Sequence, residues 1–86
     1  MKTRKKEYGT CNMVGQTIER MRKERGIKQT DFISRMQILG YDINPTSYSK
    51  LEGQIRIATD KELFVIAKLL NVTIDSLFCE SNKHPL

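Results

Sequence analysis

Apolar residues recur at helical spacing along most of the chain and divide it into short segments. The apolar face of the first segment, residues 13–25, comprises Val14, Ile18 and Met21. The apolar face of the second segment, residues 29–39, comprises Phe32, Ile33, Met36 and Leu39. Gly26 and Gly40 follow these segments and are natural helix stops. We therefore predict helices over 13–25 and 29–39.

A third helix is predicted to begin at Asn44, because Asn is a favoured N-cap and Pro45 suits the first helical position. Gly53 marks its expected end. Its inner face comprises Tyr48, Leu51 and Ile55. Its outer face comprises Thr46, Ser49, Lys50 and Gly53. The outer face is therefore polar and contains no acid.

Two more helices complete the pattern. Thr59 and Glu62 have the spacing of a capping box, which marks the start of a fourth helix. Asn71 is the expected C-cap of that helix. The inner face of that helix comprises Leu63, Ile66, Ala67 and Leu70. A fifth helix is expected from Thr73, carrying Ile74, Leu77 and Phe78. No segment shows strand-like alternation, so we predict a compact all-α, five-helix domain.

The ends of the chain lack this pattern. The 86 residues suit one domain. We place a basic, flexible N-terminal arm at 1–12, the helical domain at 13–78 and a tail at 79–86. Residues 1–28 hold nine bases and three acids, a net charge of +6, whereas the other 58 hold six bases and seven acids, a net charge of −1. One-sided positive charge is typical of proteins that bind a polyanion; a solvated helix with a floppy tail explains it equally well.

Other function classes find little support. The spacing of Cys11, Cys79 and the lone His84 fits no metal or redox site, so we expect no metal and no cofactor. For the two cysteines, free thiols are favoured over a disulfide. No stretch resembles a signal or membrane segment, which predicts a cytoplasmic protein without a membrane partner. No phosphate-binding loop or catalytic cluster is present. We therefore expect neither an enzyme nor a small-molecule site.

The segment 29–53 predicts two short helices joined by a turn, which is the layout of a helix-turn-helix DNA reader. Such a reader presents short or polar side chains near the start of its second helix to base edges in the major groove. Thr46, Ser47, Ser49 and Lys50 suit that role. The alternative is an ordinary solvated face, because Ser and Thr are common near helix starts for capping reasons alone.

Three stretches together resemble the lambda-repressor-like, Cro-type helix-turn-helix family, also called XRE. They are "GQTIERMRKERGIKQTDFISRM", "INPTSYSKLE" and "ELFVIAKLLNVTIDSLF", within residues 13–78. The resemblance implies a five-helix DNA-binding domain, usually dimeric and usually a transcriptional regulator. It also implies a structural ion pair, partly buried, between Arg22 and Glu52.

The same resemblance implies the DNA contacts. Base contacts would come from Thr46, Ser47 and Lys50. Phosphate contacts would come from Gln29, Asn44, Ser49, Gln54, Arg56 and the basic arm, residues 2–6. For that arm, a solubilising tail and a gene-start artefact are the alternatives to DNA contact. Tyr48 matches a core position, and we expect its hydroxyl near the rim.

The chain departs from the family pattern in two places. From Gln29 to Glu52 it is about five residues longer than the usual form, so we expect a longer second helix and a connection "GYDI" in which Ile43 enters the core. Ile33 stands where the family usually has Ala. After the third helix the order is Gly53-Gln54 in place of Asn-Gly, so the exit turn is expected to differ.

These observations predict a double-stranded DNA-binding regulator, most simply a repressor, that dimerises at least on DNA with half-sites roughly 34 Å apart. Phe64, Val65, Leu77 and Phe78 are candidates for the dimer surface, the alternative being that all four belong to the monomer core. A protein-interaction module on the same fold, such as an antitoxin or an anti-repressor, is the rival function.

Overall fold

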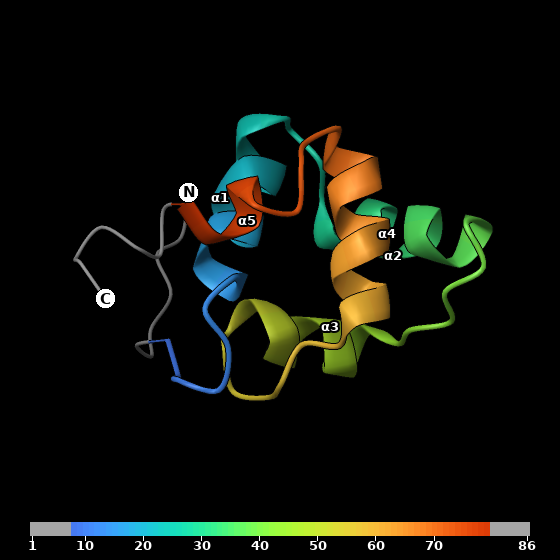
Figure 1. The fold of residues 1–86 in the computed structure, drawn as a ribbon. Helices are drawn as coiled ribbons and strands as arrows, with labels where there is room; N and C mark the ends of the chain where they lie inside the picture. The colour runs from blue at the N-terminus through green and yellow to red at the C-terminus, as the bar shows by residue number, and fades with distance from the viewer. Residues whose placement is uncertain (1–7, 80–86) are drawn as a thin grey trace.

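The computed structural model describes residues 8–79 and contains five helices and no strand within that range (Figure 1). The helices are α1 (Gly15–Glu24), α2 (Gln29–Ile38), α3 (Pro45–Glu52), α4 (Asp60–Leu70) and α5 (Ser76–Cys79). α1 packs against α3, α4 and α5, and α2 packs against α3 and α4. The all-α prediction is confirmed.

One apolar core joins all five helices. Its fully buried side chains come from α1 (Ile18), α2 (Phe32, Met36), α3 (Tyr48, Leu51), α4 (Ile66, Leu70) and α5 (Leu77). The rings of Phe32 and Tyr48 meet with their centroids 5.7 Å apart and their planes tilted by 49°. The tilted geometry is one that aromatic pairs favour, and it ties α2 to α3.

The predicted helix caps are present. Asn44 Oδ1 accepts a hydrogen bond from the backbone N–H of Ser47 at 2.8 Å. The Thr59 and Glu62 side chains form both bonds of the capping box, and Asn71 adopts the left-handed conformation that ends α4. These signals depend on neighbouring residues only, which is why sequence locates the starts of α3 and α4 accurately.

The connection between α2 and α3 has the predicted length and anchor. Gly40 takes a φ of 94°, which a side chain would oppose, and lets the chain leave α2. Ile43 is buried, and its carbonyl accepts a hydrogen bond from Gln37 Nε2 at 3.0 Å. Ile33, the residue larger than the family's usual Ala, is also buried. The predicted long second helix is also present: α2 runs from Gln29 to Ile38 with Leu39 as its C-cap, one residue short of the predicted end.

Apolar residues beyond the helix ends were assigned incorrectly. Leu39 and Ile55 are 48% and 57% exposed, because α2 and α3 end before them and the helical period no longer fixes their direction. α5 begins at Ser76, not at Thr73, and Ile74 is exposed. Leu77 lies in the monomer core, so it is not part of an exposed dimer surface.

The segment 8–12, which the sequence assigns to a flexible arm, is bonded to the domain. Gly9 N–H donates to the carbonyl of Gly53 at 2.8 Å, and Cys11 N–H donates to that of Gln54 at 2.9 Å. The Tyr8 hydroxyl donates to the carboxylate of Glu19. The ordered domain therefore begins nearer Tyr8 than Met13. The proposed basic arm, residues 2–6, lies outside the described residues. Of the predicted tail, 79–86, Cys79 is the last residue of α5, and residues 80–86 lie outside the described range.

Candidate nucleic-acid interface

α3 has two faces with opposite character. Tyr48, Leu51 and Glu52 are fully buried, whereas Thr46 and Lys50 are exposed and Ser47 is half-buried. The inner set matches the sequence prediction, as do Thr46 and Lys50, whereas Ser47 is less exposed than predicted. In Figure 1, α3 lies at the bottom of the view, below α1 and α4. Its residues Thr46, Ser49 and Lys50 are exposed. The structure thus places the predicted base-contacting side chains together on an open helix face.

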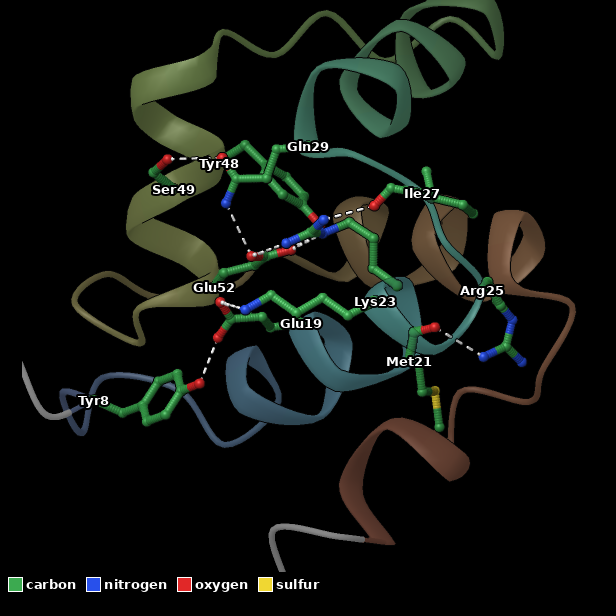
Figure 2. Close-up of polar contacts among 11 residues, drawn as sticks. Tyr8, Glu19, Met21, Lys23, Arg25, Ile27, Gln29, Tyr48, Ser49 and Glu52 are labelled. Carbon is green, nitrogen blue, oxygen red and sulfur yellow. Dashed lines mark hydrogen bonds and ion pairs between the residues drawn. The ribbon is translucent and has the colours of Figure 1, made fainter. Parts of the chain in front are cut away.

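The inner side of α3 is fixed by a buried polar network (Figure 2). Arg22 Nε donates to Glu52 Oε2 at 2.7 Å, and Arg22 Nη2 donates to Glu52 Oε1 at 3.1 Å. The remaining guanidinium nitrogen, Nη1, donates to the carbonyl of Ile27 at 2.6 Å. The Tyr48 hydroxyl donates to Glu52 Oε2 at 2.5 Å, and Gln29 Nε2 donates to Oε1 at 2.9 Å. The expected ion pair is present, and it is more deeply buried than expected, with Glu52 fully buried and Arg22 almost so.

Burial and charge act together on this network. Burial lowers the pKa of Arg22, but its hydrogen bonds and its attraction to Glu52 outweigh that effect and leave the pKa raised. Burial, followed by the charge of Glu52, raises the pKa of Tyr48 far above its usual value. The Tyr48 hydroxyl is therefore a permanent hydrogen-bond donor inside the domain. The expectation that it lies near the rim was wrong.

Gln29 connects the buried network to the open face. Its Nε2 is held by Glu52, so its Oε1 is directed to Ser49, whose hydroxyl donates to it at 3.2 Å (Figure 2). Both residues were predicted to contact phosphates. In the structure, the side chains of both residues bond other residues of the domain. Ser49 is nevertheless exposed, and no side chain caps the backbone N–H groups at the start of α2. The backbone N–H groups at that helix start suit an anion.

Two other predicted phosphate contacts have intramolecular roles. Gln54 Oε1 accepts from the backbone of Gln16 at 2.9 Å, and its Nε2 donates to the carbonyl of Gly9 at 3.0 Å. Arg56 forms a two-pronged ion pair with Glu62, at 2.9 and 2.6 Å, and also donates to the carbonyl of Ser47 at 3.0 Å. Arg56 thus ties the first turn of α3 to α4.

Sequence reasoning missed the residues that hold α1 against the end of α3. Asn12 Oδ1 accepts from the backbone of Val14 and Gly15, and its Nδ2 donates to the carbonyls of Leu51 and Arg56 at 3.1 and 2.8 Å. A Cβ on Gly15 would lie 2.4 Å from the Leu51 carbonyl oxygen. An Asn just before an apolar helical period was the available signal for Asn12; nothing local distinguishes Gly15.

The chain leaves α3 through a turn at Gly53 and Gln54. Gly53 has an ordinary helical conformation, and the left-handed residue is Gln54, with a φ of 62°. A non-glycine side chain is uncommon there. The two side-chain hydrogen bonds of Gln54 to Gln16 and Gly9 compensate, because they require the chain to turn at this position.

The N-terminal positive charge is partly neutralised within the described residues. Arg22 pairs with Glu52, Arg20 with Glu24 at 2.7 Å, and Lys23 with Glu19 at 3.2 Å. Lys50 on α3 is different, because its side chain is exposed and forms no hydrogen bond or ion pair with any residue that the structure describes. The cation best placed to meet a ligand of α3 is therefore Lys50.

Comparisons with protein families, with curated proteins and with solved structures give no match to this chain. No helix in the described part is long and apolar enough to cross a membrane. Between residues 8 and 79, no group of three or more His, Cys, Asp or Glu side chains is arranged to hold a metal ion.

Proposed function

We propose that this chain binds double-stranded DNA through α3 and regulates transcription, with the lambda-repressor-like fold as its scaffold. The observation that carries the proposal is the division of α3 into a rigidly held inner face and an open outer face. Glu52 is fixed by three side chains, and Tyr48 and Leu51 are fully buried. A helix held in this way presents its outer residues in a defined geometry, which base recognition requires.

The outer residues suit contact with DNA in two ways. Thr46 and Ser47 are short and can donate or accept hydrogen bonds, so either can meet more than one base. Lys50 can reach the acceptor atoms of guanine or a phosphate oxygen. In the proposal, Asn44, Ser49 and the open start of α2 at Gln29 contact the backbone. Gln54 and Arg56 support α3 from within the domain.

A single domain this small offers a small interface, so the proposal includes two copies on one DNA site. Pairing doubles the number of base and phosphate contacts, and it predicts a site with two-fold symmetry. The proposed role is repression, because a bound domain acts most simply by covering its site.

The experiment is a selection from random-sequence duplex DNA. The wild-type chain should enrich a two-fold symmetric site, and Thr46→Ala should change or relax the enriched bases. Asp31→Asn, which removes a negative charge at an exposed position near the start of α2, is the control and should retain the wild-type site. Selection of no site by the wild-type chain, together with binding that does not weaken as salt is raised, would contradict DNA binding.

A protein partner is the second candidate, and one observation favours it. Ile55 and Ile57, directly after α3, are 57% and 73% exposed. Apolar side chains at this position suit a protein surface better than a phosphate backbone. If the selection fails, α3 and these two residues are the surface to test with a candidate protein partner, such as a toxin or a repressor.

A further inference from the structure

The hydroxyl of Ser49, on the outer face of α3, has a fixed polarity. It donates its proton to Gln29 Oε1 at 3.2 Å, as Figure 2 shows. A serine hydroxyl has one proton to donate and two lone pairs with which it can accept. Because the proton is committed to Gln29, the exposed oxygen of Ser49 offers only lone pairs to a ligand outside the domain.

The ion pair in the core determines the direction of this bond. The Glu52 carboxylate is paired with Arg22, and an ionised carboxylate accepts hydrogen bonds but donates none. Gln29 must therefore turn its amide nitrogen towards Glu52, which Nε2 meets at 2.9 Å. The amide oxygen then lies towards Ser49, where it can only accept. A reversed amide would place oxygen against oxygen at Glu52.

Ser49 is flanked by residues to which the proposed function gives base contacts. Thr46 lies three positions before it and Lys50 directly after it, and side chains three or four positions apart are neighbours on a helix. All three side chains are exposed. The Thr46 hydroxyl forms no hydrogen bond with any residue that the structure describes, so it can turn to donate or to accept. Ser49 therefore imposes a requirement on a ligand that Thr46 does not.

The lone pairs of Ser49 match one class of group in the major groove. Phosphate oxygens only accept, so a phosphate could bond Ser49 only after the serine proton had left Gln29. Guanine O6 and thymine O4 are also acceptors, whereas adenine N6 and cytosine N4 carry amino groups that donate. The matching partner is therefore the amino group of an adenine or a cytosine.

We propose that Ser49 accepts a hydrogen bond from a base amino group, so that the strand facing it must carry adenine or cytosine at one position of each half-site. Gln29 is a positioning residue, because it acts by holding the Ser49 proton. This inference rests on the proposed function. For Ser49, it replaces the phosphate contact with a contact that reads a base.

The test is the selection from random-sequence duplex DNA, carried out with the wild-type chain, Ser49→Ala and Gln29→Ala. The wild-type chain should enrich adenine and cytosine over guanine and thymine at one position of a strand. In the selected duplex, guanine or thymine there should weaken wild-type binding about tenfold, a usual effect of one mismatched base pair. Ser49→Ala should reduce that difference to about twofold or less, because an alanine side chain makes no hydrogen bond.

Gln29→Ala separates positioning from a general structural role. It frees the Ser49 proton, so the preference at that one position should relax while the other enriched bases stay the same. A merely structural Gln29 would instead weaken binding to all sequences alike. Ser34→Ala, which removes an exposed hydroxyl from α2, is the matched control and should retain the preference.

The polarity itself can be measured without DNA, by NMR of the Gln29 carboxamide in the free chain. Ser49→Ala should shift the signal of its carbonyl carbon and leave its amide protons, which bond Glu52, nearly unchanged. The reverse pattern would overturn the inference. A selected site without the adenine-or-cytosine position, or with one that Ser49→Ala retains, would also overturn it and leave DNA binding in place. Selection of no site would overturn both proposals.

Discussion

Arg22 on α1 and Glu52 at the end of α3 form a two-pronged ion pair in the core, with N···O distances of 2.7 and 3.1 Å. Their side chains are 6% and 0% exposed. Every carboxylate oxygen and every guanidinium nitrogen of this pair has a hydrogen-bond partner. The pair therefore fixes the position of α3 against α1, and through Gln29 it also fixes α3 against the start of α2.

Removing one partner of this pair should destabilise the domain strongly. Arg22→Met leaves the Glu52 charge buried and unpaired, and Glu52→Gln leaves Arg22 in the same state. Each change should lower the free energy of unfolding by about 3–5 kcal/mol. The double variant should lose less free energy of unfolding than the two single variants lose in sum, because neither buried charge then remains without its partner. Urea unfolding followed by circular dichroism measures all three.

The exposed ion pair between Arg20 and Glu24 is the matched control. Both side chains are well exposed and lie one helical turn apart. Arg20→Met should therefore change the free energy of unfolding by about 1 kcal/mol at most. If Arg22→Met were as mild as Arg20→Met, the buried pair would not have the structural role that we assign to it.

Acid should weaken the link between α3 and α4. Burial raises the pKa of Glu62, but hydrogen bonds from Arg56 and from the backbone of Thr59 outweigh this and leave the pKa below its usual value. The unfolded chain then binds the proton more tightly, so this contribution to stability is present above about pH 4.3 and is lost as pH falls through the folded-state pKa.

The measurement for this link is the urea midpoint between about pH 6 and pH 2. Glu62→Gln should reduce the loss of stability in the acid range, because it removes the group that titrates. Glu24→Gln, which alters an exposed carboxylate, should leave the acid dependence close to that of the wild-type chain. The same acid dependence in all three proteins would contradict the assignment to Glu62.

Gly15 should tolerate no side chain, although it lies in a helix. Ala normally favours a helix over Gly by about 0.5–1 kcal/mol. Here the new Cβ would lie 2.4 Å from the Leu51 carbonyl oxygen and 2.5 Å from that of Glu52. Gly15→Ala should therefore destabilise the domain by about 1–3 kcal/mol, the usual cost of overpacking.

Ser34→Ala is the control for Gly15→Ala. Ser34 is exposed on α2, so the change should be neutral or slightly stabilising. Thermal unfolding compares the two variants with the wild-type chain. A Gly15→Ala variant as stable as Ser34→Ala would mean that α1 and the end of α3 are not in the close contact described above.

The sequence located most of the fold because the decisive signals are local. Asn44, Pro45 and the capping box at Thr59 act on neighbouring backbone groups, and the structure has all of them as predicted. The errors at Leu39 and Ile55 come from extending the apolar period past the ends of the helices. Beyond a helix end, the direction of a side chain depends on the path of the loop, which the period does not contain.

The candidate site was predictable only in part. The inward and outward residues of α3 follow from its period, and the pair of Arg22 with Glu52 came from the family resemblance. Gln54 bonds residues that lie 38 and 45 positions away in the chain, and Arg56 bonds residues that lie 6 and 9 positions away. These contacts form only when the chain packs, so no local sequence pattern indicates them. The close approach at Gly15 is likewise a property of the packed helices.

If the outer face of α3 binds DNA, as proposed, Lys50 is the side chain whose removal should weaken binding. The measurement is fluorescence anisotropy of a selected duplex across a range of salt concentrations, with the wild-type chain, Lys50→Ala and Arg25→Ala. Arg25 is the control because it is an exposed cation near the end of α1, and its side chain donates a hydrogen bond to the carbonyl of Met21. Arg25→Ala removes the same charge as Lys50→Ala.

Wild-type binding should weaken steeply as salt is raised, because each phosphate contact releases counterions. Lys50→Ala should weaken binding by about 1–3 kcal/mol if the lysine meets a guanine, or lower the salt slope by about 1 if it meets a phosphate. Arg25→Ala should bind nearly as the wild-type chain does. If Lys50→Ala bound as tightly as Arg25→Ala with the same salt slope, the claim that α3 reads DNA would be contradicted.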